Sequence, residues 1–311
     1  MNRFNQASDQ SMKRKLFIDK CFKVGFMIAA FLSASTILLI VLFVGMKGIQ
    51  PFLSSYEYQQ VNVLSFLFGS VWRPDQGIYG VGYIVINTLL SAFGALLLAF
   101  PIAVLTALFI EKMAPKQIRG FMQTTIELLA SIPSVVYGIF AAGSISVIVK
   151  ALGDTLGFVT AGRNSFLAVI LLLAIMIFPT ITSLSMSAIK AVPRELELGS
   201  LALGASKTQT NFKVVLASAK SGIFAGAILG LGRAFGEATA VAMVAGNKLF
   251  GPTFDLFDIT RTLTSTMLSG LKETSGLDYD IRFSVGIVLM VVILGSNLLL
   301  NYVKKKIGRI R

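Results

Sequence analysis

The chain has 311 residues, of which 55% are hydrophobic and 14% charged. Soluble domains carry about 25% charged residues, and disordered chains are far less apolar, so both classes are excluded. The net charge is +13, there is no histidine, and Cys21 is the only cysteine. These counts exclude a disulfide within the chain, a Cys/His zinc site and a histidine-dependent nucleophile. The chemistry that remains must use carboxylates, arginine, lysine, hydroxyls and backbone groups, which argues against an enzyme.

Several apolar runs are long enough to cross a membrane, since about 18 apolar residues mark a spanning helix. They lie at about 24–46, 81–110, 121–149, 165–189, 214–246 and 283–303. The first run is longer than the roughly 7–15 residues of a signal-peptide core, so we expect a retained anchor. The sequence therefore predicts an all-α integral membrane protein, with an N-terminal segment at 1–23, a six-helix transmembrane domain at 24–303 and a basic tail at 304–311.

Lysine and arginine gather in the segments that would share one side of the membrane. These segments precede the first helix, join helices two and three, join helices four and five, and follow helix six. Because basic loops stay in the cytoplasm, the pattern places both termini in the cytoplasm of a multi-pass protein of the cell membrane. The positive net charge follows from this bias and from attraction to anionic membrane lipid, so we expect no nucleic-acid partner.

Two long loops, at about 47–80 and 247–282, would lie on the outer side. Both are long enough to fold over the outer mouth of the protein. Trp72, the only tryptophan, lies in the first loop, and we expect it at the level of the lipid headgroups.

The stretch "GLGRAFGEATAV" (230–241) places Arg233 and Glu237 inside the fifth apolar run. An arginine near the bilayer midplane costs at least about 2.5–3.5 kcal/mol, so it persists where it is paired or faces a water-filled path. Glu237 lies one helical turn after Arg233, so the two could pair. The sequence leaves open whether this is a buried ion pair that fixes helix packing or part of a substrate or ion pathway. An arginine favours an oxyanion ligand, because its planar fork presents paired donors.

The same run contains small residues at a spacing of four: Gly222, Gly226 and Gly230. This spacing predicts close approach of a neighbouring helix. The run at 214–246 would be about 50 Å long as one helix, which exceeds the roughly 30 Å hydrocarbon core. We therefore expect it either to extend into the cytoplasm or to break.

Helix three contains Glu127 near its expected cytoplasmic end and Pro133 between Ser131 and Ser134. A proline inside a helix bends it and frees a carbonyl, and the neighbouring hydroxyls could line an anion path. Glu127 could act as a gate or a coupling contact. The alternatives are a carboxylate that reaches the inner interface and a proline that only bends the packing.

The cytoplasmic loop at about 190–213 has its own helix signals. Pro193 suits the first position of a helix, Gly204 suits a left-handed stop, and Ser206 with Gln209 forms a capping-box pattern. These signals predict a compact helix-turn-helix knob. Its exposed side mixes charges with leucines, as either a docking surface or an ordinary amphipathic connector would.

This loop resembles the EAA loop of ABC importer permeases, whose pattern is E-A-A-x-x-x-G followed by I-x-L-P. Gly204 matches the glycine, whereas Leu198 stands where the family has its glutamate and Ala217 where it has its proline. The resemblance implies a set of residues that couple the chain to an ATPase: Pro193, Arg194, Glu195, Glu197, Leu198 and Gly204.

Four stretches resemble the PstC-type permease subunits of the phosphate-specific ABC transporter, which belong to the binding-protein-dependent importer permeases. They are "FLFGSVWRPDQGIYG" (66–80), "ELLASIPSVVYGIF" (127–140), "IMIFPTITSLSMSAIKAVPREL" (175–196) and "LGLGRAFGEATAVAMVAGN" (229–247). The run 236–241 reads G-E-A-T-A-V, closer to the G-E-T-M-A-V of that family than to the G-E-T-A-P-L of its PstA-type partner. The resemblance covers roughly 63–303.

The resemblance implies a permease subunit of an ATP-driven importer that moves inorganic phosphate by alternating access, with Arg233 and Glu237 as its membrane-embedded charged pair. It also implies a PstA-like permease partner, two copies of a nucleotide-binding ATPase subunit and an extracellular phosphate-binding protein. We expect no cofactor bound by this chain, since ATP would be used by the partner subunits. A permease for another oxyanion, molybdate or sulfate, and an ion-coupled secondary transporter remain as alternatives.

Overall fold

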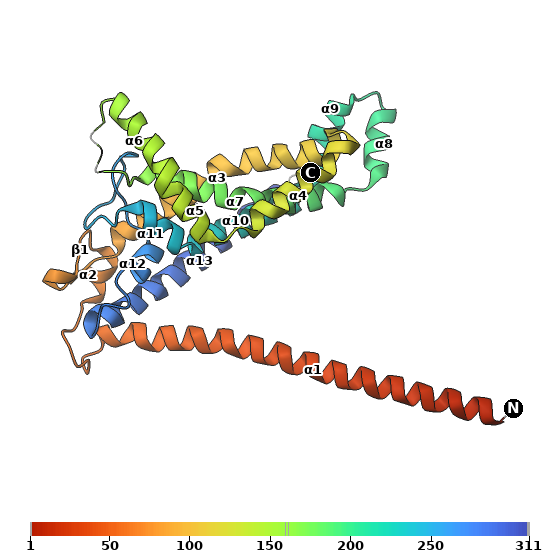
Figure 1. Ribbon diagram of the computed structural model, residues 1–311, viewed down its shortest axis with the longest axis horizontal. Helices are drawn as coiled ribbons and strands as arrows, with labels where there is room; N and C mark the ends of the chain where they lie inside the picture. The colour runs from red at the N-terminus through yellow and green to blue at the C-terminus, as the bar shows by residue number, and fades with distance from the viewer. Residues whose placement is uncertain (1, 159, 161, 310–311) are drawn as a thin grey trace.

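The structure, a computed structural model, describes residues 2–158, 160 and 162–309. Residue 1 of the expected N-terminal segment and residues 310–311 of the expected basic tail lie outside the described residues. The described chain is mostly helical, with one short β-hairpin and long loops at one end (Figure 1). The expected all-α fold is confirmed.

The structure sets the following element bounds. The α-helices are α1 Asn2–Ile49, α2 Val63–Phe68, α3 Gly82–Leu108, α4 Lys116–Ser131, α5 Ser134–Phe140, α6 Ser146–Thr155, α7 Phe166–Lys190, α8 Arg194–Ala202, α9 Lys207–Gln209, α10 Leu216–Gly236, α11 Thr239–Ala245, α12 Leu263–Leu268 and α13 Leu277–Arg309. π-helical turns follow α3, α5 and α9 at Phe109–Met113, Ala141–Ile145 and Thr210–Val215. Strands β1 Trp72–Arg73 and β2 Ile78–Tyr79 pair antiparallel around the 3-10 turn Pro74–Gln76, and a further 3-10 turn, Gln50–Phe52, follows α1.

Within the described chain, 6 stretches are long and apolar enough to span a membrane. They are Ile18–Phe52, Gly82–Met113, Ser134–Thr155, Phe166–Lys190, Lys207–Gly236 and Leu277–Lys306. The predicted number of spans is confirmed, but the third predicted helix is wrong in its extent. The expected helix at 121–149 is divided, because α4 is a separate helix and the third span begins at Ser134. The run at 214–246, which was expected either to extend into the cytoplasm or to break, breaks after Gly236, and α11 continues it as a separate short helix.

Helix α7 lies at the centre of the bundle, and small residues bring its neighbours close to it. Helix α3 packs on α7 through a buried face of alanines: Ala92, Ala95, Ala99 and Ala103. On the α10 side, a methyl group added to Gly222 would lie 2.5 Å from the Ala188 Cβ, and one added to Gly230 would lie 2.7 Å from the Ile181 Cγ1. Lipid tails are as apolar as side chains, so close packing of this kind holds membrane helices together. The close approach predicted from the glycine spacing is confirmed.

This packing predicts opposite effects for two glycine substitutions in α10. We expect Gly222→Ala to destabilise the chain by about 1–3 kcal/mol, because the new methyl group would displace the Ala188 backbone. Gly232→Ala should instead gain up to about 1 kcal/mol of helix propensity, since nothing lies within 4 Å of a methyl group there. Thermal unfolding of the purified chain in detergent measures both effects. Shifts of the same sign would contradict the packing of α10 on α7.

The bundle has two different ends, which we call the knob end and the loop end. The knob end carries α8 and α9 and lies to the right in Figure 1, together with the start of α1 and the end of α13. The loop end, to the left, carries α2, the β-hairpin and the start of α13 (Figure 1).

The two long loops are joined at the loop end. The Trp72 N–H donates to the Leu249 carbonyl (2.7 Å), and the Gly251 N–H donates to the Ser70 carbonyl (3.0 Å). The Trp72 side chain is 1% exposed and packs edge-on against Tyr79 at 5.3 Å between ring centres. The Trp72 ring therefore forms part of the core of the joined loops, and its expected position at the headgroup level stays a prediction.

Helix α1 packs on α13 through its last turns. The Ser284 hydroxyl donates to the Gly48 carbonyl (2.7 Å), and Phe43 meets Phe283 edge to face at 5.7 Å. Most side chains between residues 18 and 43 are exposed in this chain. The helix runs without interruption through residues 23 and 24, so the expected boundary of the N-terminal segment is not a break in the structure.

Candidate functional site

The fifth span breaks at Glu237. Helix α10 ends at Gly236, Glu237 is extended (φ −77°, ψ 112°), and α11 begins at Thr239. The Glu237 Oε1 accepts the Ala240 N–H (3.0 Å), as a capping side chain does at a helix start. The Glu237 carbonyl accepts the Thr264 hydroxyl from α12 (2.8 Å). The Glu237 carboxylate therefore accepts a backbone N–H at the start of α11, and the Glu237 carbonyl, which the break leaves without a helical partner, accepts the Thr264 hydroxyl.

Arg233 lies in the last turn of α10. The partial negative charge of a helix C-terminus stabilises a cation at this position. Its Nη1 donates to the Thr180 Oγ1 in α7 (3.0 Å). The predicted ion pair with Glu237 is wrong, because the helix ends between the two residues and the one-turn relation is lost. Within the described part of the chain, the Arg233 guanidinium has no carboxylate within ion-pair distance.

The face of α10 that carries Arg233 is open. Arg233 and Glu237 are both partly exposed, and a methyl group added to Gly232 or Gly236 would meet nothing within 4 Å. The opposite face, with Leu231, Ala234 and Phe235, is buried in the core. A guanidinium in this position can therefore meet a ligand without first being uncovered.

The expected kink at Pro133 is a complete break between two helices. Helix α4 ends at Ser131, Ile132 is extended, and α5 begins after Pro133. Because proline has no N–H and clashes with the preceding turn, the carbonyls at the end of α4 lose their helical partners. The Tyr137 hydroxyl replaces one of them by donating to the Leu129 carbonyl (2.8 Å).

The two breaks meet inside the bundle. Helix α5 packs on α11, and a methyl group added to Gly138 would lie 2.8 Å from the Ala240 Cα and 2.7 Å from the Met243 sulfur. Two interrupted spans thus lie side by side next to a charged side chain, an arrangement that membrane transporters use where irregular backbone lines a pathway.

The other residues proposed from the sequence for this region are dispersed around the α4–α5 break. Ser131 is exposed and its hydroxyl donates to the Leu128 carbonyl (2.7 Å), while Ser134 is partly exposed. Glu127 is exposed on α4, outside the third span, and no contact joins it to Arg233 among the residues that the structure describes. The structure therefore brings Pro133 and its flanking serines near the meeting point of the breaks, but not Glu127.

A cavity of about 330 Å³ opens at the α10–α11 break, between α12 and α13. Most of its wall is apolar, and Arg282 lines one side. Arg282 is 6% exposed and its Nη1 donates to the Thr266 carbonyl (2.7 Å) and to the Ser269 carbonyl.

Sequence reasoning missed Arg282, Thr180 and Thr264, because each acts through a contact with a distant segment. The one local signal is that Thr180 follows Pro179 in a spanning helix.

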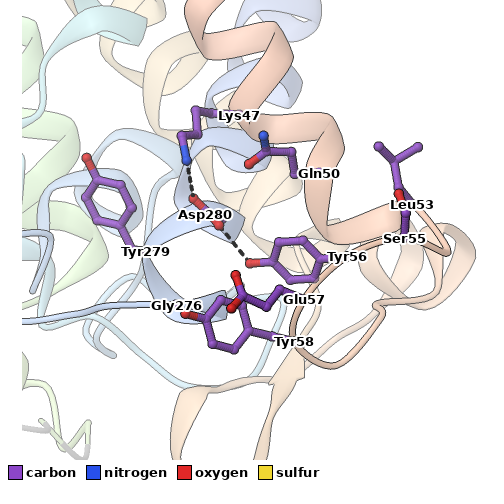
Figure 2. A pocket seen from close by; sticks show the side chains of 10 residues that line it. All are labelled: Lys47, Gln50, Leu53, Ser55, Tyr56, Glu57, Tyr58, Gly276, Tyr279 and Asp280. Carbon is purple, nitrogen blue, oxygen red and sulfur yellow. Dashed lines mark hydrogen bonds and ion pairs between the residues drawn. The ribbon is translucent and has the colours of Figure 1, made fainter.

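A second cavity, which is polar and has a volume of about 570 Å³, lies at the loop end (Figure 2). Asp280 stands at its centre, where it accepts the Tyr56 hydroxyl (2.8 Å) and pairs with Lys47 (3.5 Å). Burial, with the added effect of the hydrogen bond to Asp280, raises the pKa of Tyr56 above its ordinary value, so this hydroxyl stays a donor. These contacts fasten the end of α1 and the first loop to α13, so we regard this cavity as part of a structural clamp.

No group of three or more Asp, Glu, Cys or His side chains that could hold a metal ion occurs among the described residues.

The segment between the fourth and fifth spans folds as the predicted knob, which consists of α8, α9 and the turn between them. Gly204 adopts the left-handed conformation (φ +87°), and Ser206 forms a capping box with Gln209. Pro193 precedes α8 directly rather than taking its first helical position. An ion pair between Lys112 and Glu197 ties the knob to the end of the second span.

The outer surface of α8 is uncovered in this chain. None of its residues is buried, and Leu198 is 54% and the adjoining Leu203 91% exposed. Arg194 and Glu195 are exposed beside them. Exposed leucines interspersed with charges on a rigid projecting helix form the kind of patch that a protein partner covers.

The chain resembles known proteins over most of its length. Residues 99–309 match the family described as binding-protein-dependent transport system inner membrane components. The chain is 35% identical over 272 residues to the probable ABC transporter permease protein YqgH of Bacillus subtilis (strain 168), covering 86% of this chain and 84% of that protein. It is 33% identical over 271 residues to the phosphate transport system permease protein PstC of Pasteurella multocida (strain Pm70), covering 79% and 82%.

Solved structures agree with this fold. A chain of a bacterial alginate ABC transporter, in complex with its alginate pentasaccharide-bound periplasmic protein, superimposes with a TM-score of 0.61 at 22% identity, covering 93% of this chain and 98% of that one. This likeness concerns the fold alone. The chain belongs to the binding-protein-dependent transport system inner membrane component family.

Proposed function

We propose that the chain is the PstC-type permease subunit of an ATP-driven importer of inorganic phosphate. The observation that carries this proposal is the partly exposed Arg233 side chain next to the point where two broken spans meet. The chain is also 33% identical to the PstC protein of Pasteurella multocida. A broken helix lets backbone donors and side chains face a pathway instead of lipid. A guanidinium there presents paired donors to a phosphate oxygen.

In the proposed mechanism, phosphate enters at the loop end and meets the Arg233 guanidinium. Thr180 holds the guanidinium in place through one nitrogen, which leaves its other donors for the anion. The Glu237 carboxylate stabilises the start of α11 and adds a negative charge beside the break. That charge limits how tightly the anion is held, so that phosphate can leave when the helices reorient by alternating access.

The proposed assembly pairs this chain with a PstA-like permease subunit, two copies of an ATPase subunit and an extracellular phosphate-binding protein. The knob would contact the ATPase through Arg194, Glu195, Leu198 and the surface beside them. ATP would be bound and hydrolysed by those partners, and this chain would bind no cofactor. In this orientation the knob end and both termini face the cytoplasm, and the joined loops receive the binding protein.

Uptake of labelled phosphate tests this function. Cells that lack the chain should take up phosphate poorly at low external concentration, and expression of the chain should restore uptake. Unlabelled phosphate should compete with the label, whereas molybdate and sulfate should not. Competition by either of these anions, with weak competition by phosphate, would assign the permease to another oxyanion. Uptake that persists without a nucleotide-binding partner would indicate an ion-coupled transporter instead.

Two substitutions at Glu237 separate its charge from its capping role. Glu237→Gln keeps an oxygen that can accept the Ala240 N–H, so we expect nearly normal stability but altered phosphate release, seen as a lower maximal uptake rate. Glu237→Ala also removes the cap, and we expect a further loss of about 1 kcal/mol of stability. Uptake kinetics and thermal unfolding of the two variants give the comparison. Wild-type uptake by Glu237→Gln would mean that the carboxylate charge has no role of its own, and equal stability of the two variants would mean that the cap adds nothing.

A further inference from the structure

A basic cavity of about 470 Å³ lies at the knob end, between the start of α10 and the end of α13. Three lysines line it, one from α10 and two from α13, together with a serine and an asparagine: Lys220, Lys304, Lys305, Ser221 and Asn301. Lys304 and Lys305 lie at the knob-end limit of the sixth span, whereas Lys220 and Ser221 lie inside the fifth span, in the second turn of α10. Lys304 and Lys305 therefore place one side of the cavity where the sixth span leaves the bilayer. The cavity is separated from Arg233 by about three to four turns of α10.

The charge of this cavity favours an anionic occupant. No acidic residue is among the described residues that line it. Lys304 and Lys305 have no ion-pair partner within the described ranges, and Lys220 is partly buried beside them. The hydroxyl of Ser221 and the amide of Asn301 add neutral groups that can donate hydrogen bonds to oxygens.

A second, apolar hollow adjoins the basic cavity. This groove of about 660 Å³ lies between α3, α10 and α13, and Phe224 lines both spaces. Its wall is built from large apolar side chains, including Phe93, Leu97, Phe100, Ile228 and Leu300. Leu97 is 77% exposed, so the groove is open to the surface of the bundle. On α10 the basic cavity begins at Lys220 and the groove continues through Ala227 and Ile228, about two turns deeper.

We propose that the cavity and the groove together bind one anionic glycerophospholipid of the surrounding bilayer. The phosphodiester headgroup lies among Lys220, Lys304 and Lys305, and an acyl chain lies in the apolar groove beneath Phe224. Basic pockets between spanning helices have the charge to hold anionic lipid headgroups, and lysines at helix ends reach the headgroup level. A free phosphate ion would satisfy the lysines but has nothing to fill the groove, so the two adjoining spaces favour a lipid.

Native mass spectrometry of the assembled transporter tests this proposal. The full-length chain, purified together with its copurifying subunits and delipidated in detergent, is titrated with dioleoyl phosphatidylglycerol. We expect one retained lipid for each copy of the chain. The variant Lys220→Gln/Lys304→Gln/Lys305→Gln should lower the affinity for that lipid by about fivefold for each lysine removed, and by about a hundredfold in total.

A matched control removes the same number of lysines from the same end of the bundle. Lys15→Gln/Lys20→Gln/Lys23→Gln lies on the exposed start of α1, outside the cavity, and should retain the lipid. If the two triple variants lose lipid affinity equally, the lysines act only through diffuse charge attraction, and the proposed site is wrong. Absence of bound lipid from the assembled wild-type transporter, with binding by the isolated chain, would show that another subunit covers the groove and would also overturn it.

Two further arms separate a lipid from a phosphate ion. Inorganic phosphate at millimolar concentration should not displace the lipid, and displacement would assign the cavity to the free anion. Leu97→Trp, which fills the groove without touching the lysines, should weaken binding of dioleoyl phosphatidylglycerol at least fivefold. Unchanged binding by this variant would remove the acyl-chain part of the proposal. None of these substitutions involves Arg233 or Glu237, so the lipid site can fail while the transport proposal stands.

Discussion

Cells that carry Arg233→Gln are expected to lose phosphate uptake by ten- to a hundredfold while keeping normal amounts of the chain in the membrane. Hydrogen bonds to charged groups contribute about 1.5–3 kcal/mol, which corresponds to that range of affinity. The loss should fall on transport rather than on folding, because the Arg233 side chain is partly exposed and its one described hydrogen bond goes to the Thr180 hydroxyl. Labelled-phosphate uptake and the membrane level of the chain are measured on the same cells.

Two companion variants define what the arginine supplies. Arg233→Lys keeps the charge but loses the planar fork, so uptake should be intermediate. Arg163→Gln makes the same chemical change at an exposed position in the loop between α6 and α7 and should leave uptake unchanged. Normal uptake by Arg233→Gln would remove this residue from the mechanism, and equal losses in both glutamine variants would point to a general effect of lost positive charge.

The features that could be predicted from the sequence are those set by local patterns. The apolar runs predicted six spans because hydropathy alone decides whether a helix can cross a bilayer. The knob was predicted because its turn needs a left-handed residue at Gly204 and its second helix needs the Ser206 cap, and both signals act within a few residues. The glycines at 222, 226 and 230 predicted a close contact, although not which helix would fill it.

The length of the run at 214–246 indicated that it could break, but the positions of the two breaks could not be predicted from local patterns, because distant segments stabilise them. Pro133 indicates a kink, but a full break also needs a partner for the freed Leu129 carbonyl, which Tyr137 supplies. At Glu237, the carbonyl is held by Thr264 of α12, far along the chain. The expected Arg233–Glu237 ion pair was wrong for the same reason: the spacing rule for helical pairs assumes an unbroken helix. The burial of Trp72 was not predicted, because its partners Phe66 and Tyr79 form a small loop core that hydropathy does not reveal.

The second large effect is expected at the knob. In the double variant Leu198→Asp/Leu203→Asp, the ATPase subunit should no longer copurify with the chain, and phosphate uptake should fall to the background of cells lacking the chain. Burying one leucine at an interface contributes about 1.5–3 kcal/mol, so loss of two would weaken binding by at least a hundredfold. Because Leu198 is 54% and Leu203 91% exposed, the substitutions leave the interior of this chain unchanged.

A matched pair at the opposite end of the bundle serves as the control. Leu249→Asp/Leu256→Asp changes two leucines that are 40% and 43% exposed in the second long loop. This variant should keep the ATPase bound, whatever it does to delivery of substrate at the loop end. If the knob variant also keeps the ATPase at wild-type stoichiometry, α8 is only a connector and the contact must lie elsewhere at the knob end. If both pairs release the ATPase, the cause is a general disturbance of the bundle, and the proposed role of the exposed leucines is withdrawn.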